Sequence, residues 1–257
     1  MNAFLPINKN DMNQRGWEEL DFIFVSGDAY VDHPSFGPAI ICRLLEKHGY
    51  RVGIIAQPDW HSTEDFQRLG RPCFGFLVSS GNLDSMLNKF TAAKKTRQSD
   101  AYSPGGNDGC RPDRAVVVYS NHLREVWKDV PIIIGGIEAS LRRFAHYDYW
   151  SNMIRRSILF DSRANLLIYG MGERQILEIA AQLQQGIAVT DITTVRGTAC
   201  LLKELDSIWE YKEIPSYEAV IADKSVFAQA FKEEYLEQDA IRGRTIVQRC
   251  GNHFVVQ

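Results

Sequence analysis

The chain has 257 residues, of which 45% are hydrophobic and 24% are charged, and its formal net charge is −3. This length suits one large α/β domain, or a domain with an appendage, and the composition is that of a soluble globular protein. No apolar run approaches the roughly 20 residues of a membrane-spanning helix, and the N-terminal residues lack the order of a secretory signal, so we expect a cytoplasmic protein with no membrane partner.

From about residue 21 to residue 185, short apolar runs alternate with amphipathic segments. This alternation predicts a parallel sheet covered by helices. Strands are expected at 21–26, 51–56, 73–79, 131–134 and 165–169. Helices are expected at 38–48, after Asn82, at 114–128 (where a strand is the less favoured alternative), from about Ala139, and at 174–185. The loop at 99–112 is long for a compact domain, so it is either functional or mobile.

After Gly186 the alternation changes. Residues 197–202 and 207–215 resemble short antiparallel strands, 216–239 reads as one helix with Ser216 as its N-cap, and 245–256 reads as a hairpin. The predicted organisation is an N-terminal extension (1–19), an α/β domain (20–187) and a smaller α+β segment (188–257). The hairpin stops at Gln257 without a polar tail, which suggests that the natural chain continues.

Four of the predicted strands end in glycine-containing turns, which should meet at one edge of the sheet. In open α/β sheets ligands bind outside the carboxyl ends of the strands, and glycine lets a backbone approach a ligand closely. The crevice is therefore expected to be lined by Gly27, Asp28, Ser80, Asn82, Gly135, Gly136, Glu138, Gly170, Gly172 and Glu173. The alternative is that these glycines only make tight turns between strands and helices.

The loop after the first strand brings together Tyr30, Asp32 and His33 beside Asp28. Acid, phenol and imidazole groups together can bind a metal or move protons, so these residues join the candidate site. A network of hydrogen bonds that caps the loop explains the same residues equally well. No catalytic residue is assigned.

Familiar cofactor motifs are absent from the sequence. The dinucleotide fingerprint G-x-G-x-x-G does not follow the first strand, there is no phosphate loop, and neither H-x-x-x-H nor C-x-x-C occurs. The five cysteines lie at least 31 positions apart, whereas zinc and iron–sulfur sites use cysteines about two to four residues apart. We therefore expect no zinc or iron–sulfur site built from neighbouring cysteines, and no residue is assigned as a metal ligand.

Basic clusters occur at 94–97, 142–143 and 155–156. They are either solvated helix faces or a patch for RNA. The net charge of −3 argues against a nucleic-acid partner.

Four longer blocks resemble the N-terminal region of the YgiQ-type radical SAM family. They are residues 27–37 (GDAYVDHPSFG), 100–106 (DAYSPGG), 135–150 (GGIEASLRRFAHYDYW) and 169–173 (YGMGE). The resemblance implies a doubly wound parallel sheet of the cobalamin-binding or flavodoxin-like kind, ahead of a radical SAM barrel. In such proteins three cysteines of the barrel, spaced C-x-x-x-C-x-x-C, hold a [4Fe–4S] cluster that binds S-adenosylmethionine.

This chain departs from the family pattern in two places. It lacks the cysteine triplet, so neither the cluster nor S-adenosylmethionine is expected on its residues. It also lacks the cobalamin signature D-x-H-x-x-G, because Asp32 and His33 are adjacent, which leaves cobalamin binding open. The expected partners are the chain's own barrel and an unidentified small-molecule substrate.

Two hypotheses about function remain. The first is the accessory N-terminal part of a radical SAM iron–sulfur enzyme, inactive alone. The alternative is a free-standing module that binds a small ligand or nucleotide without catalysis.

Overall fold

The computed structural model describes residues 4–239 and 242–257. Its strands are β1 (Phe22–Ser26), β2 (Val52–Ala56), β3 (Gly75–Ser79), β4 (Ile132–Ile134), β5 (His146–Asp148), β6 (Met153–Arg155), β7 (Leu166–Ile168), β8 (Thr198–Leu202), β9 (Tyr211–Ile214), β10 (Thr245–Cys250) and β11 (His253–Val256). Its α-helices are α1 (Lys9–Gln14), α2 (Gly37–Lys47), α3 (Ser85–Lys89), α4 (Ala115–Val126), α5 (Gly136–Ser140), α6 (Ile158–Ser162), α7 (Glu173–Gln184), α8 (Tyr217–Ala222) and α9 (Lys224–Leu236). Short 3-10 helices lie at Asp65–Gln67, Pro104–Gly106 and Val189–Asp191.

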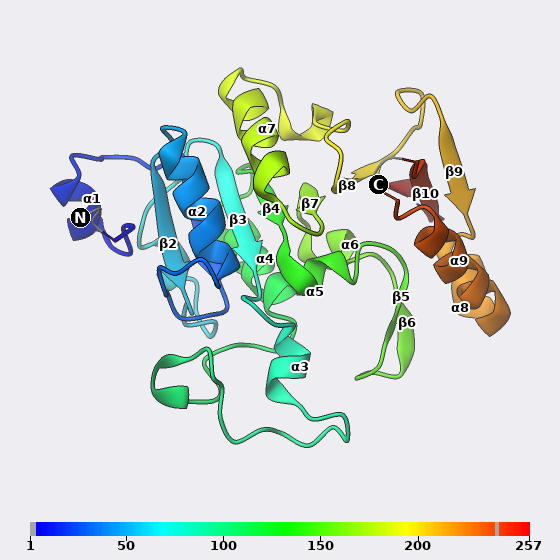
Figure 1. Ribbon diagram of the computed structural model, residues 1–257, viewed down its shortest axis with the longest axis horizontal. Helices are drawn as coiled ribbons and strands as arrows, with labels where there is room; N and C mark the ends of the chain where they lie inside the picture. Colours follow the sequence, from blue (N-terminus) through cyan, green and yellow to red (C-terminus); the bar gives the residue numbers. More distant parts are fainter. Residues whose placement is uncertain (1–3, 240–241) are drawn as a thin grey trace.

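Nine strands form one twisted sheet in the order β2-β1-β3-β4-β7-β8-β11-β10-β9, and β5 and β6 form a separate hairpin (Figure 1). The first five strands of this order are parallel to one another. Numbered along the chain, they follow the flavodoxin-like order 2-1-3-4-5. The expected doubly wound, flavodoxin-like fold is therefore confirmed.

Each central strand is buried on both faces, so its side chains alternate between two cores. In β1, Ile23 and Val25 join the core beneath α4 and α6, whereas Phe22 and Phe24 join the core beneath α2 and α7. The same alternation explains why the strands are continuous apolar runs rather than apolar–polar alternations. Figure 1 shows α2 and α7 on one side of the sheet and α4 on the other.

The parallel strands bring their carboxyl ends to one edge of the sheet. The turns after β1, β3, β4 and β7 meet there, and α2, α5 and α7 begin there. Figure 1 shows α3, the long loop after it and the β5–β6 hairpin projecting beyond this edge. None of the helices in the described ranges is long and apolar enough to cross a bilayer.

The five predicted strands of the parallel sheet, the helix now called α4 and the hairpin β10–β11 are confirmed. The strand predicted at 207–215 exists as β9, but its predicted antiparallel pairing is wrong, because β9 pairs in parallel with β10. The helix predicted from about Ala139 begins earlier, at Gly136.

The single helix predicted at 216–239 is also wrong, because it is broken at Asp223. The backbone of Asp223 is extended, and its carboxylate accepts a hydrogen bond from the backbone N–H of Ser225 at 2.7 Å, so it caps a new helix, α9. Ser216 does cap the first piece, α8, as expected. The spacing of apolar residues continues across such a break, so it does not show that an aspartate ends one helix and caps the next.

Candidate functional site

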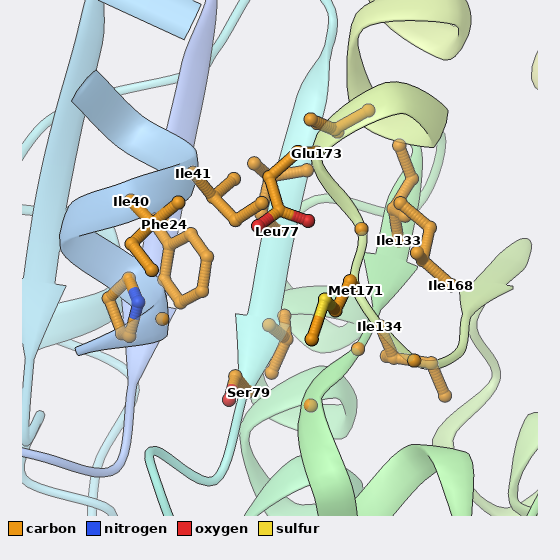
Figure 2. Close-up of a pocket in the computed structure, with 18 of the residues that line it drawn as sticks. Phe24, Ile40, Ile41, Leu77, Ser79, Ile133, Ile134, Ile168, Met171 and Glu173 are labelled. Carbon is orange, nitrogen blue, oxygen red and sulfur yellow. The ribbon is translucent and has the colours of Figure 1, made fainter. Parts of the chain in front are cut away.

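A pocket of about 260 Å³ opens at the carboxyl edge between α2 and α7 (Figure 2). Its floor is formed by the ends of β1, β3, β4 and β7, through Phe24, Leu77, Ile133 and Ile168. Ile40 and Ile41 of α2, Met171 and Ile176 complete its apolar walls. The pocket therefore lies at the switch point where ligands bind in this kind of sheet.

Two glycines leave this pocket open. Gly136 has a φ of +82°, and a Cβ there would lie 2.7 Å from Ser79 Oγ. A Cβ on Gly172 would lie 2.9 Å from the Cγ2 atom of Ile168 in the floor. Side chains at these positions would be strained or would close the space, so the turns after β4 and β7 require glycine.

The predicted site residues divide into two groups. Gly135, Gly136, Gly170, Gly172 and Glu173 line the pocket together. Gly27, Asp28, Tyr30, Asp32, His33, Ser80, Asn82 and Glu138 do not line it, and they make contacts elsewhere along the same edge.

Asp28 is the centre of a buried ion network beside the pocket. Arg111 Nη2 lies 2.9 Å from Asp28 Oδ1 and 3.1 Å from Asp100 Oδ2, and Arg111 Nη1 donates to the carbonyl of Ser80 at 2.6 Å. Burial raises the pKa of Asp28, although the Asn82 N–H and Arg111 oppose the shift. This network attaches the long loop 99–112 to the ends of β1 and β3.

The loop after β1 is fixed by contacts within the protein. Asn82 donates its amide N–H to the carbonyl of Ser35 at 3.0 Å, and its backbone N–H donates to Asp28 Oδ2 at 2.7 Å. Asp32 forms an ion pair with Arg43 of α2, and this pair lowers the pKa of Asp32. These contacts agree with the alternative in which the polar residues of this loop form hydrogen bonds that cap it, rather than a metal or proton-transfer site.

Tyr30 and His33 of the same loop lie apart from the pocket. The Tyr30 hydroxyl accepts a hydrogen bond from the backbone N–H of Leu5 at 3.1 Å. The exposed His33 ring accepts one from the backbone N–H of Ser35 at Nδ1, also at 3.1 Å.

Glu138 is fully buried in α5 and joins three segments. Its carboxylate accepts hydrogen bonds from the backbone N–H of Ser85 at 2.9 Å and of Val116 at 3.0 Å, and from the Ser85 hydroxyl. These donors lie at the starts of α3 and α4, whose free N–H groups favour an anion. Burial is the main cause that raises the pKa of Glu138, and the nearby charge of Asp84 adds to it.

Two of the three basic clusters considered for RNA, 142–143 and 155–156, are paired with carboxylates. Arg142 pairs with Asp84, and Arg143 pairs with Glu234 at 2.5 Å. Both Arg155 and Arg156 lie within 3.0 Å of the Asp161 carboxylate.

The β5–β6 hairpin was not expected from the sequence. Asp148 in β5 is buried and pairs with Arg114, next to the start of α4, at 2.5 Å. His146 Nδ1 lies 3.1 Å from the carbonyl of Phe144, and because a carbonyl only accepts, this nitrogen bears the proton. Burial lowers the pKa of His146 to about 4, so the ring is neutral near pH 7.

Sequence reasoning missed the apolar wall of the pocket, because Phe24, Ile41 and Leu77 have the same pattern as core residues. Met171 was the available signal. In the sequence it is a large apolar residue between Gly170 and Gly172, and in the structure 85% of its surface is exposed.

The residues present do not fit an iron–sulfur cluster. Within residues 4–239 and 242–257, no three His, Cys, Asp or Glu side chains come together as metal ligands. Cys42, Cys200 and Cys250 are buried, and burial raises the pKa of Cys200 to about 11, whereas clusters are held by thiolates.

Replacing Arg111 with methionine should lower the free energy of unfolding by about 3–5 kcal/mol, because it leaves Asp28 and Asp100 buried without their cation. The control is Arg71→Met, which removes an exposed, solvent-screened pair with Asp129 and should leave the free energy of unfolding almost unchanged. Urea unfolding at pH 7 measures both. Equal effects of the two substitutions would contradict the structural role of the network.

The neutral His146 should make stability depend on pH. Between pH 6.5 and pH 4 the unfolded chain binds a proton at this residue that the folded chain does not. The contribution of neutral His146 to the free energy of unfolding is therefore fully present above pH 6.5, falls as the pH is lowered below that value, and is lost once the pH has fallen through 4. The loss from this residue is at most about 3 kcal/mol. In His146→Gln, urea unfolding at a series of pH values should give a shallower slope over this interval than in the unsubstituted protein. Identical slopes would show that His146 does not contribute.

Comparison with known proteins agrees with the resemblance found in the sequence. Residues 4–257 match the model of the family described as Radical SAM N-terminal. Two similar relatives are UPF0313 proteins of Clostridium botulinum (strain ATCC 19397 / Type A), 59% identical over 254 residues, and of Clostridium perfringens (strain ATCC 13124), 56% identical over 256 residues. Each match covers 99% of this chain but only 39% of the relative. The resemblance to the YgiQ-type family is thus confirmed, and the chain belongs to the Radical SAM N-terminal family.

Proposed function

We propose that this chain is the ligand-holding N-terminal part of a radical SAM protein, and that its pocket holds a small organic group next to the reactive centre of the longer protein. The observation that carries the proposal is the apolar pocket at the carboxyl edge, lined by the glycine turns after β4 and β7. Family membership supports the radical SAM part of the proposal.

The size of the pocket limits what enters it. A cavity of about 150 Å³ lined by Leu, Ile and Phe is known to accept benzene, so about 260 Å³ accommodates one substituted ring or two fused rings. A whole corrin macrocycle exceeds this volume. If cobalamin binds, the macrocycle therefore lies outside the pocket, with only a side group inserted.

The [4Fe–4S] cluster and S-adenosylmethionine belong, in this proposal, to the part of the relatives that this chain does not span. The described cysteines do not fit a cluster, and the relatives extend well beyond the matched region. The chain alone is then inactive, and the substrate reaches the cluster only in the longer protein.

Anaerobic reconstitution with iron and sulfide tests this division of roles. The full-length Clostridium botulinum relative should gain the visible absorption of a [4Fe–4S] cluster and, when reduced, should cleave S-adenosylmethionine to 5′-deoxyadenosine and methionine. This chain, treated in parallel, should do neither. A cluster spectrum from this chain alone would overturn the proposal that it is only the ligand-holding part.

The pocket is tested separately with benzamide as a neutral single-ring probe. Benzamide should bind the chain weakly but saturably by isothermal titration, and Ile41→Phe should reduce the affinity at least about tenfold by filling the space between α2 and Gly172. The matched control is Ile221→Phe on α8, where 51% of the side chain is exposed, and it should leave binding unchanged. Binding that is insensitive to Ile41→Phe would place the ligand elsewhere.

A further inference from the structure

The pocket contains one charged side chain, Glu173, in the first turn of α7. Its remaining lining is apolar side chains, glycines and Ser79, and none of these described lining residues is Lys, Arg or His. Ser79 is already engaged, since its hydroxyl accepts from the backbone N–H of Gly81 at 3.0 Å and lies 3.3 Å from the carbonyl of the same residue. Among the described lining residues, the Glu173 carboxylate is therefore the charged side chain that a ligand meets.

Glu173 is free to bind. In the described part of the chain, no hydrogen bond or ion pair engages its carboxylate, and Figure 2 shows the carboxylate projecting from α7 over the pocket, on the side of Ile41 and Leu77. Other acids along this edge are already occupied. Asp84 pairs with Arg142, and Glu138 accepts three hydrogen bonds.

The charge of this carboxylate determines which ligands fit. A phosphate or carboxylate placed beside Glu173 would be repelled by its like charge, and none of the described lining residues is a cation that would compensate. A cation or an N–H donor is instead attracted to the Glu173 carboxylate, because a charge-assisted hydrogen bond to a carboxylate is about twice as strong as a neutral one.

The position of Glu173 also suits the helix that contains it. An acidic residue in the first turn favours the N-terminal end of α7, which has no side-chain cap. That role requires only a negative charge near the helix start, whereas the open pocket next to the carboxylate requires a further explanation. If Glu173 only stabilises the helix, removing its charge should leave ligand selectivity unchanged. If its carboxylate contacts the ligand, removing the charge should weaken the selectivity.

We infer that the pocket selects a flat, apolar group bearing a cationic or N–H-donating head, such as an amine or amidine, and that Glu173 determines this specificity. The inference rests on the proposed function of the pocket. It excludes ligands that would enter with a phosphate group first, which sets it apart from a nucleotide site that holds phosphate at a helix N-terminus.

Three isosteric probes test the inference: benzamidine, which is cationic, benzamide, which is neutral and donates N–H, and benzoate, which is anionic. Isothermal titration on the unsubstituted chain should give the affinity order benzamidine, benzamide, benzoate, with about tenfold or more between the first and the last. In Glu173→Gln the difference between benzamidine and benzoate should fall to about twofold or less, while benzamide still binds.

Two further variants separate specificity from helix stability. Glu178→Gln removes the same charge from the same helix outside the pocket and should preserve the affinity order. Glu173→Asp keeps the charge at the helix start on a shorter side chain, and it should retain the order with a smaller difference. A thermal melt of each variant establishes that α7 stays folded.

The outcomes are distinct. An unchanged preference for benzamidine in Glu173→Gln, or an equal loss of preference in Glu178→Gln, would overturn the role of Glu173 while leaving the pocket as a binding site. Tighter binding of benzoate than of benzamidine to the unsubstituted chain would overturn the ligand class. Failure of all three probes to bind would overturn the proposed function of the pocket and this inference with it.

Discussion

The carboxyl edge of the sheet depends on one buried carboxylate, that of Asp28. It sits where β1 ends, and it receives both the guanidinium of Arg111 and the backbone N–H of Asn82. The close approach requires glycine at position 81, because a Cβ there would lie 1.9 Å from Asp28 Oδ1. The end of β1, the turn after β3 and the loop 99–112 are thereby fixed relative to one another. Ser79 and Gly81 of the turn after β3 form one wall of the pocket. Desolvating this network is costly: burial is the main cause that raises the pKa of Asp28, and the nearby charge of Asp100 adds to it.

Most of the parallel sheet could be predicted because its strands carry their signal locally. Runs such as Phe22–Ser26 and Ile132–Ile134 are short, apolar and closed by glycine or serine, and two-sided burial leaves few other uses for such runs. The meeting of the four turns at one edge then follows from parallel pairing alone. For this reason the sequence could place Gly135, Gly136, Gly170 and Gly172 at this edge, whereas Gly37 and Gly81, which also line the pocket, were not among the predicted site residues.

The features that escaped prediction depend on contacts between distant residues. The parallel partner of β9 is β10, some 30 residues later, and nothing in the sequence of β9 distinguishes this pairing from an antiparallel one. The β5–β6 hairpin depends on Asp148 meeting Arg114, a pair separated by 34 positions. Likewise Asp28 and Glu138 read as crevice residues by position. Only the donors supplied by Arg111 and by the starts of α3 and α4 reveal that their oxygens are used within the fold.

These contacts separate the acidic residues of this edge into those that hold the fold together and one that is available to a ligand. Asp28, Asp84, Glu138 and Asp148 are all buried and all bound to arginines or backbone N–H groups, so their charges hold loops and helix starts in place. An unpaired charge among them would destabilise the edge, because nothing in its surroundings would replace lost water. Glu173 differs because it lies beside an apolar cavity where water still reaches it, and within residues 4–239 and 242–257 no side chain or backbone group pairs with its carboxylate. A ligand that enters the pocket removes that water, so it must replace the lost hydrogen bonds of the carboxylate or bind poorly. The ion network of Asp28 and Arg111 holds the turn after β3, which supplies Ser79 and Gly81 to the pocket, so this part of the lining is fixed when a ligand enters.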